Sequence, residues 1–380
     1  MTTSNLTKRL TKGFEEEVYT GTWAGEIIGV SHHVAADLSG YSTEPDSRNV
    51  EFTTEPYRDY EALLTRLMNK RCRLRRYLRE LGDYTLIPGS TLSLVGAGEF
   101  QISDPDNPYY AYIRDTYGTD VVTASCHLNV GVEDSEVLLR AYRVLRCEAS
   151  MFLALTAESP FLNGEVTGFH STRWHVFPKT PSSVPLFADH EQFMRWFEGQ
   201  LETKAMRNPR HLWLSVRPNG PETPRDLNRV EVRICDRIAC PRLMQGVIAL
   251  IEGRVWEVME NPDLDSLADA DSADLEALAL ANEEAAAKDS LDAVVHDWRS
   301  GRELRMGTWI EERLKELEPT CELHGLAELL PAVEELLDQG SPAAKWLEQV
   351  RRGRSPHHVI CEAAEEMAEI DKALMGAECA

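Results

Sequence analysis

Several features that identify common protein classes are missing from this sequence. It has 380 residues, with 40 Lys and Arg against 63 Asp and Glu, and its formal net charge is −23. Such a field repels nucleic-acid phosphates and anionic lipids, so we expect no nucleic acid and no membrane among its partners. No apolar run approaches the roughly 18 residues of a membrane-spanning helix. The first 12 residues lack the apolar stretch of a secretory signal.

Cysteines are few and dispersed. The eight cysteines form no Cys-x-x-Cys pair and no spacing typical of a zinc site. Dispersed cysteines in a large chain without a signal are typical of reduced thiols, so we expect a cytoplasmic protein whose cysteines are packing residues. The spacing of Cys235 and Cys240 permits a disulfide but does not predict one, and the sequence leaves the oligomeric state open.

Familiar phosphate-binding and nucleophile motifs are absent as well. The sequence has no Gly-x4-Gly-Lys-Ser/Thr loop, no complete dinucleotide fingerprint and no Gly-x-Ser-x-Gly elbow. A P-loop enzyme, a dinucleotide-dependent enzyme and a serine hydrolase therefore have no support. A nucleotide would have to bind through metal ions held by a sheet.

What is present is typical of a globular protein with a large core, because 43% of the residues are hydrophobic and 27% are charged. Residues 1–243 mix short alternating segments with turn residues, including an expected turn at 217–220. Residues 244–380 are rich in Ala, Leu and Glu at helical spacing. We predict a sheet-containing catalytic core followed by a helical region that packs on it, together forming one compact domain.

Three segments carry charge or apolar patterns of their own. Residues 135–155 predict a core helix, and the acidic stretch at 260–292, with a net charge of −10, predicts a solvated helix and linker. Residues 61–81 predict an amphipathic helix whose basic face either binds phosphate or is solvated, the second being favoured. Its apolar stripe is expected to consist of Leu64, Leu67, Leu74, Leu78 and Leu81.

Four short segments, at 13–19, 50–53, 126–130 and 230–235, alternate apolar residues with ionisable ones, as half-buried strands do. Each pattern alone is typical of a solvated edge strand. In one sheet with aligned polar faces, however, their carboxylates would repel one another unless cations lay between them. Oxygen ligands with one imidazole suit Mg²⁺ or Mn²⁺. The predicted metal ligands are Glu15, Glu17, Glu51, His127 and Glu231.

Two further residues follow from this arrangement. Arg233 shares the polar face of its strand and suggests that the metals hold a phosphate, which its guanidinium also binds. Glu16 lies on the apolar side unless the register differs, in which case it would be a ligand. We favour Glu15 and Glu17.

At these strands the chain resembles the glutamate–cysteine ligases, in particular their cyanobacterial type, within the carboxylate–amine ligase group. The similarity covers about residues 13–245 and rests on blocks in the right order. These blocks read GFEEEVYTG (13–21), EPDSRNVEFTT (44–54), LIPGSTLSL (86–94), TASCHLNVGV (123–132), SPFLNG (159–164), TGFHSTRW (167–174) and NRVEVRICD (228–236). The resemblance implies an α+β fold with a curved antiparallel sheet lined by helices, a glutamine-synthetase-like core and a helical C-terminal third.

The resemblance also implies roles for individual residues. The family's sheet binds two or three Mg²⁺ ions at the positions predicted above, and either Glu44 or Asp46 completes one site. Arg233 is similar to the arginine that contacts the nucleotide phosphates, with Glu231 beside it in the catalytic set. Asn129 stands where the family often has a second histidine and is expected to contact ATP. Arg173, with Thr167 and Gly168 in its loop, is similar to the arginine that orients glutamate.

The implied reaction is ATP-dependent ligation of the γ-carboxylate of glutamate to the amino group of cysteine, the first step of glutathione synthesis. Bringing a triphosphate and a carboxylate together demands divalent metals and arginines more than a nucleophile or a general base, and the inventory above matches that demand. Three alternatives remain open. They are the same ligation with a different amine, a metal-dependent hydrolase, and a relative that binds nucleotide or metal without catalysis.

Overall fold

An antiparallel sheet occupies the middle of the molecule in the computed structural model, which describes residues 9–94, 96, 98–376 and 379. The prediction that residues 1–12 contain no secretory signal rests partly on residues 1–8, which lie outside the described residues. The strand order is β2-β3-β1-β5-β9-β8, and β4 also pairs with β1. The strands are β1 (Lys12–Thr22), β2 (Tyr41–Thr43), β3 (Asn49–Thr53), β4 (Tyr84–Ile87), β5 (Cys126–Gly131), β8 (Val216–Asn219) and β9 (Arg229–Val232).

The register of the sheet aligns the four predicted strands as neighbours. Glu17 pairs with Glu51 across β1 and β3, and Glu15 pairs with His127 across β1 and β5. Asn129 pairs with Glu231 across β5 and β9. Because side chains alternate between faces, this register sends the predicted ligands to one face. The other face is apolar and buried, and includes Phe14, Val18, Val50, Phe52, Leu128, Val130, Val230 and Val232.

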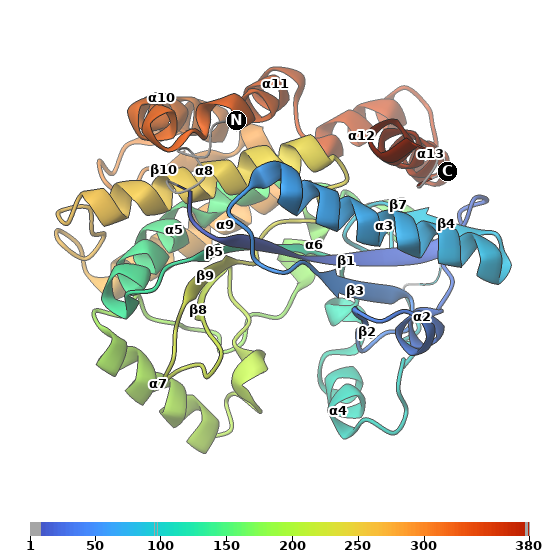
Figure 1. Cartoon of the computed structure of the whole chain (residues 1–380), viewed down its shortest axis with the longest axis horizontal. Coiled ribbons are helices and arrows are strands. Elements are labelled where there is room, and N and C mark those ends of the chain that lie inside the picture. Colours follow the sequence, from blue (N-terminus) through green and yellow to red (C-terminus); the bar gives the residue numbers. More distant parts are fainter. Residues whose placement is uncertain (1–8, 95, 97, 377–378, 380) are drawn as a thin grey trace.

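Helices cover the apolar face (Figure 1), where α3 packs on β1 and α5 packs on β8 and β9. The segments α4 and α7 extend on the other side, at opposite ends of the sheet. The larger helices are α3 (Tyr60–Gly82), α4 (Pro108–Tyr117), α5 (Ser135–Thr156), α7 (His190–Glu202), α8 (Pro241–Glu260), α9 (Ser272–Asp289), α10 (Met306–His324), α11 (Pro331–Gln339), α12 (Pro342–Arg351) and α13 (Pro356–Met375).

Short elements complete the chain. They are α2 (Ser31–Asp37), α6 (Thr172–Val176), the strand pairs β6 (Phe161–Leu162) with β7 (Glu165–Val166) and β10 (Val294–His296) with β11 (Glu303–Arg305), and the 3-10 turns η1 (Gly118–Val121), η2 (Pro209–His211), η3 (Ser290–Asp292) and η4 (Ala327–Leu329). Among the described residues, none of the helices is both long and apolar enough for a bilayer crossing.

The predicted core helix at 135–155 is confirmed as α5. Asp134 caps it by accepting the backbone N–H groups of Glu136 and Val137, and 18 of its 22 residues are buried. α5 packs against α8 and α9, which come from the C-terminal part of the sequence. One apolar core therefore contains residues from both sides of residue 243, while the division of the chain at that residue stays a prediction.

The favoured interpretation of the basic helix, a solvated face, holds for Arg66, Arg73, Arg76 and Arg79, which are exposed, but fails for two other arginines. In α3, Arg71 and Arg75 are buried, and both bind Asp371 of α13. Arg71 also binds Glu16 of β1, with 2.6 Å between Nη2 and Oε1. These two arginines thus tie α3 to the sheet and to α13. The apolar stripe also differs at its end, because Leu81 is 39% exposed.

The acidic stretch is more integrated than a solvated linker. Glu283 of α9 is buried and binds both Arg146 of α5 and the indole N–H of Trp174. Asp265 accepts from Nε of Arg143 at 2.8 Å. Most acids of the stretch, such as Glu260 and Asp274, are exposed as predicted. The prediction fails at Glu283 and Asp265, because a local charge count cannot detect arginines that come from another element.

The expectation of free thiols is wrong for one pair. Cys72 of α3 and Cys379 near the C-terminus form a disulfide across 307 positions of sequence. Cys235 and Cys240, whose spacing permits a bond, are both free.

Candidate active site

Two groups of ligand-type side chains lie on the polar face of the sheet. Each group offers three ligand atoms that all lie within 4.8 Å of one another. The first group is Glu15, His127 and Glu231, and the second is Glu17, Glu44 and Glu51. All five residues predicted as metal ligands therefore belong to one of the two groups, and Glu44 joins them.

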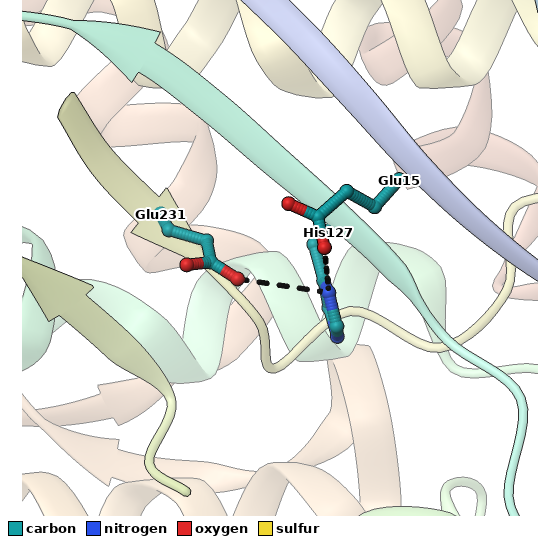
Figure 2. Close-up of side chains that lie close together, drawn as sticks. All are labelled: Glu15, His127 and Glu231. Atoms are coloured by element: carbon teal, nitrogen blue, oxygen red, sulfur yellow. Dashed lines mark hydrogen bonds and ion pairs between the residues drawn. The ribbon is translucent and has the colours of Figure 1, made fainter. Parts of the chain in front are cut away.

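The first group comes from three adjacent strands, β1, β5 and β9, and its side chains point toward one another (Figure 2). Nδ1 of His127 lies 3.1 Å from Oε2 of Glu15 and 3.7 Å from Oε1 of Glu231. Burial and the charge of Glu231 raise the pKa of Glu15, but the hydrogen bond and charge of His127, together with the charge of Arg233, leave it below its ordinary value. Two carboxylates and one imidazole thus converge on one point.

Glu231 is fully buried and strongly bonded. Arg233 donates from Nη1 to its Oε1 at 2.6 Å, and Arg217 donates from Nε to its Oε2 at 2.8 Å. Asn219 donates to the same Oε2 at 2.6 Å. Burial alone would raise the pKa of Glu231, but the guanidinium groups of Arg217 and Arg233 hold it well below its usual range. The carboxylate is therefore ionised and held between two cations.

Arg217 was missed because residues 217–220 predicted a turn. The structure places Arg217, Pro218 and Asn219 in β8, the last strand of the sheet. An edge strand tolerates proline because one of its N–H rows needs no partner. Arg217 pairs directly with Glu231 across β8 and β9. The signal that could have found it is the alternation of Val216, Arg217 and Pro218, which proline obscured.

The second group consists of carboxylates alone. Oε2 of Glu17 accepts the backbone N–H and the hydroxyl of Ser125, both at 2.8 Å, which fixes its orientation. Ser42 donates to Glu51 at 3.2 Å. Burial and the nearby charges of Glu51 and Glu17 raise the pKa of Glu44 well above its ordinary value. Three acids that repel one another in this way form a donor set that a hard divalent cation would stabilise.

Two alternatives from the sequence are now resolved. Glu16 projects to the opposite face, where it is buried and binds Arg71 and Arg237, so the preference for Glu15 and Glu17 is confirmed as to face. Asp46 is held by Arg48 through bonds of 2.7 Å to both carboxylate oxygens. Glu44 rather than Asp46 therefore adjoins Glu17 and Glu51.

A cavity of about 340 Å³ adjoins the first group. Its lining includes Glu15, Asn129, Arg229 and the backbone around Gly13. Asn129 donates to Oε1 of Glu15 at 3.3 Å and accepts from Nε of Arg229 at 3.1 Å. The residue predicted to contact the nucleotide therefore lies between a carboxylate of the first group and an arginine on the cavity wall.

Arg173 lies in α6 and contacts the chain just after β9, at the end of that strand away from Arg229 and the cavity. It is buried and donates to the backbone carbonyls of Ile234 and Arg233 at 3.0 and 2.9 Å. Burial lowers its pKa, although the carboxylates of Asp236 and Glu17 oppose this. Thr167 bonds the hydroxyl of Thr172 at 2.6 Å, and Gly168 has a φ of +90°, which suits glycine in that loop. The three predicted substrate-binding residues thus share one loop and helix.

The described part of the site brings together oxygen donors, one imidazole and arginines. The carboxylates of the second group repel one another and could bind a divalent metal ion. In the first group, Glu15 and His127 could bind one as well. Glu231 of that group already forms ion pairs with Arg217 and Arg233. Such a face can concentrate phosphate and carboxylate groups, which are the reactants of phosphoryl transfer.

Known proteins share this sequence and this fold. The model of the family described as glutamate-cysteine ligase family 2 matches residues 11–368. A Sorangium cellulosum protein, provisionally named glutamate–cysteine ligase 2, is 26% identical over 245 residues, which cover 63% of this chain and 62% of that relative. That alignment thus spans less than two thirds of the relative's length. A Rubrobacter xylanophilus protein with a similar provisional name is 26% identical over 95% of this chain and 93% of its own.

A solved structure shows the same fold. The glutamate–cysteine ligase of Francisella tularensis, crystallised in complex with AMP, has a TM-score of 0.76 and 13% sequence identity to this chain. The match covers 98% of this chain and 91% of that one. It confirms the predicted α+β architecture, with its antiparallel sheet lined by helices.

Proposed function

The chain belongs to glutamate-cysteine ligase family 2, and from this premise we propose that it joins the γ-carboxylate of L-glutamate to the amino group of L-cysteine at the expense of ATP. The products are γ-glutamylcysteine, ADP and phosphate. The reaction would be the first step of glutathione synthesis.

The observation that carries the proposal is the pair of three-ligand groups on one face of the sheet, with Arg233 beside them. Amide formation from a carboxylate requires activation, and a phosphoryl group from ATP supplies it. Both substrates of that step are anions, so their approach costs free energy unless fixed positive charge offsets the repulsion. A face built from metal-ligand carboxylates and arginines suits this task.

We propose that both groups hold Mg²⁺ or Mn²⁺. Glu17, Glu44 and Glu51 would form one site, and Glu15, His127 and Glu231 would form another. A bound divalent ion would neutralise the phosphates and polarise the phosphorus–oxygen bonds. His127 suits this role because Ser125 contacts its other ring nitrogen, Nε2, at 2.9 Å and thereby orients the ring.

The two ends of the polar face offer binding groups for different substrates. At one end, the cavity lined by Asn129 and Arg229 adjoins Glu15 and has room for the nucleoside of ATP. At the other end, Arg173 lies within electrostatic range of Glu17. We propose that ATP enters from the cavity and that the α-carboxylate of glutamate contacts the loop of Thr167, Gly168 and Arg173.

In the proposed reaction an oxygen of the γ-carboxylate attacks the γ-phosphorus of ATP, and the bond from that phosphorus to the β,γ-bridging oxygen breaks. Arg233 stabilises the charge that develops on the transferred group, while Glu231 holds the guanidinium in place at 2.6 Å. The amine nitrogen of cysteine then attacks the acyl carbon of γ-glutamyl phosphate. Phosphate leaves, and the nitrogen loses a proton to solvent.

A coupled assay of ADP release tests the proposal. The full chain is incubated with Mg²⁺-ATP and glutamate, with cysteine or with other amines. We expect ADP release to depend on both glutamate and cysteine and to match the γ-glutamylcysteine formed. Equal rates with another amine would assign a different acceptor. Product release without ATP would indicate a hydrolase, and no turnover with any amine would indicate a binding protein.

A further inference from the structure

A second cavity, of about 320 Å³, lies on the helix-covered side of the sheet. Its lining residues come from the end of α5, the segment that follows β9, the start of α8, and helices α12 and α13. Arg237 lines it and donates from Nη2 to Glu16 at 3.1 Å. Because Glu16 leaves β1 on the face opposite Glu15 and Glu17, the sheet separates this cavity from the candidate active site.

Two buried polar groups in its wall have unused hydrogen-bonding capacity. Glu158 is 3% exposed and Arg237 is fully buried. Within the described part of the chain, Oε2 of Glu158 and Nε of Arg237 have no hydrogen-bond partner. Nη1 of Arg237 faces the thioether of Met367, which is a weak acceptor. Buried groups of this kind are normally satisfied, so an acceptor and a donor without partners in one cavity point to a ligand.

The charges around the cavity favour a carboxylate next to Arg237. Arg71, Arg75 and Arg237 are three guanidinium groups that share the carboxylates of Glu16 and Asp371. The other carboxyl group that acts on Arg237 is Glu158, so one positive charge of this buried set has no carboxylate partner whenever Glu158 holds its proton. A guanidinium keeps its proton even when buried, so an anion is the group that would compensate it.

Glu158 favours a cationic group on the same ligand. Burial raises the pKa of Glu158 to about 8. The charge of Arg237 lowers this pKa, and the charge of Asp236 raises it further. Near neutral pH the carboxyl group therefore retains its proton for most of the time. A ligand ammonium group would replace that proton as the compensating charge.

Much of the remaining lining is apolar, although Lys345, Gln349 and Glu366 also line the cavity. The apolar part of the lining includes Ile238, Leu243, Trp346, Met367 and Ile370. The volume is at the lower end of the roughly 300–1,000 Å³ of small-molecule sites. The cavity therefore suits a molecule with an anion, a cation and a short apolar chain.

We propose that this cavity is a binding site for an α-amino acid with an apolar side chain, whose carboxylate contacts Arg237 and whose ammonium group contacts Glu158. The site goes beyond the proposed ligase function and does not depend on it. Because the sheet lies between the two sites, binding here does not compete with ATP.

Isothermal titration calorimetry on the full chain tests the site with chemically dissected probes. L-leucine carries both charged groups, 4-methylpentanoate lacks its ammonium group, and 3-methylbutylamine lacks its carboxylate. We expect L-leucine to bind with a stoichiometry of one, with or without ATP. Each analogue is expected to bind at least tenfold more weakly. Failure of L-leucine to bind, or equal binding of either analogue, would overturn the proposal.

Variants connect the binding to the cavity. Glu158→Gln keeps the shape of the neutral carboxyl group, so we expect it to fold and to weaken L-leucine binding at least tenfold. Ala363→Phe, from the cavity wall, fills the space and should abolish binding by a separate route. Glu365→Gln, an exposed change on α13, is the matched control and should bind as the unaltered chain does. Unchanged binding in both cavity variants would contradict the assignment.

Discussion

Three consecutive glutamates in β1 have different environments, which depend on the face of the strand. Glu15 and Glu17 project to the polar face, where each belongs to a group of potential metal ligands. Glu16 projects to the other face and is fully buried between Arg71 and Arg237. The period of two in a strand was enough to predict this division. It could not predict the arginines that bind Glu16, since they come from distant positions.

The sequence also predicted which residues would meet, because every predicted ligand lies at the polar position of an alternating strand. Arg217 escaped prediction because its strand contains a proline and ends in a turn. The sequence could not decide between Glu44 and Asp46, because in the folded chain the guanidinium of Arg48 donates to both carboxylate oxygens of Asp46. Local pattern predicts the face of a side chain, whereas its partner depends on tertiary packing.

Substitution of Glu231 tests the assigned catalytic set. We expect Glu231→Gln to reduce ligase turnover by roughly 100-fold, because it removes a ligand charge and releases Arg233 and Arg217. The melting temperature should show that the variant folds. Glu222→Gln, an exposed change in the loop after β8, serves as the control. Near-normal turnover of Glu231→Gln would refute the assignment of this residue.

Glu44 offers a test of the second metal group that does not require turnover. Electron paramagnetic resonance measures free Mn²⁺ in the presence of the protein. We expect Glu44→Gln to weaken Mn²⁺ binding at one site by roughly tenfold or more, since it removes one of three carboxylate ligands. Glu55→Gln, an exposed change beyond β3, should bind Mn²⁺ normally. Equal Mn²⁺ binding by both variants would remove Glu44 from the site.

At the scale of elements, buried ion pairs connect the helices that support the sheet. Arg254 of α8 binds both carboxylate oxygens of Glu148 of α5 at 2.8 Å, and Trp298 donates to the same carboxylate at 3.0 Å. The sequence predicted α5 as a core helix from its apolar spacing. It could not predict that a charged residue on that helix would be fully buried, because only the distant arginine makes this possible.

The stability contribution of this pair should depend on pH. Burial would raise the pKa of Glu148, but Arg254 and Arg313 lower it to about 2. The unfolded value is about 4.3, so the contribution is present above that pH and is lost as the pH falls toward 2. We expect Glu148→Gln to cost about 3 kcal/mol at pH 7, on the basis of 1.36 kcal/mol per unit.

Urea denaturation across pH 2.5 to 7 measures this effect. The difference in unfolding free energy between the unaltered chain and Glu148→Gln should shrink steadily below about pH 4.5. Glu133→Gln, an exposed change before α5, should show little difference at any pH. A difference for Glu148→Gln that stays constant over this range would contradict the lowered pKa.

At the scale of the whole molecule, the resemblance to glutamate–cysteine ligases predicted the fold, and the match to a solved ligase confirms it. Helix α3 meets the C-terminal segment in a way that neither pattern nor resemblance predicted. Arg71 and Arg75 of α3 bind Asp371 of α13, and the disulfide between Cys72 and Cys379 joins α3 to the segment that follows α13. Contacts across 300 positions leave no local signal in a sequence.

Thiol labelling tests this connection. We expect iodoacetamide to label six cysteines of the denatured, unreduced protein and all eight after reduction. Cys72→Ser should lower the unfolding free energy by about 2–4 kcal/mol, because the bond restricts the unfolded chain. Cys361→Ser, which alters a free thiol of α13, should have a smaller effect. Labelling of eight cysteines without reduction would disprove the disulfide.

The net charge of −23 is a property of the whole molecule. It leads us to expect no nucleic-acid or anionic-membrane partner, whereas the candidate site depends on a few acids and arginines at short range. An acidic protein can therefore bind ATP if its clustered carboxylates hold metal ions. Cytoplasmic localisation stays a prediction.

The most direct test of the central claim follows an oxygen atom. Glutamate labelled with ¹⁸O in its γ-carboxylate is incubated with the protein, Mg²⁺-ATP and cysteine, and the phosphate released is analysed by mass spectrometry. If the γ-carboxylate attacks ATP and cysteine then displaces phosphate, each phosphate carries one ¹⁸O atom and equals the γ-glutamylcysteine formed. Unlabelled phosphate would mean that water attacks ATP, which would contradict ligation through γ-glutamyl phosphate.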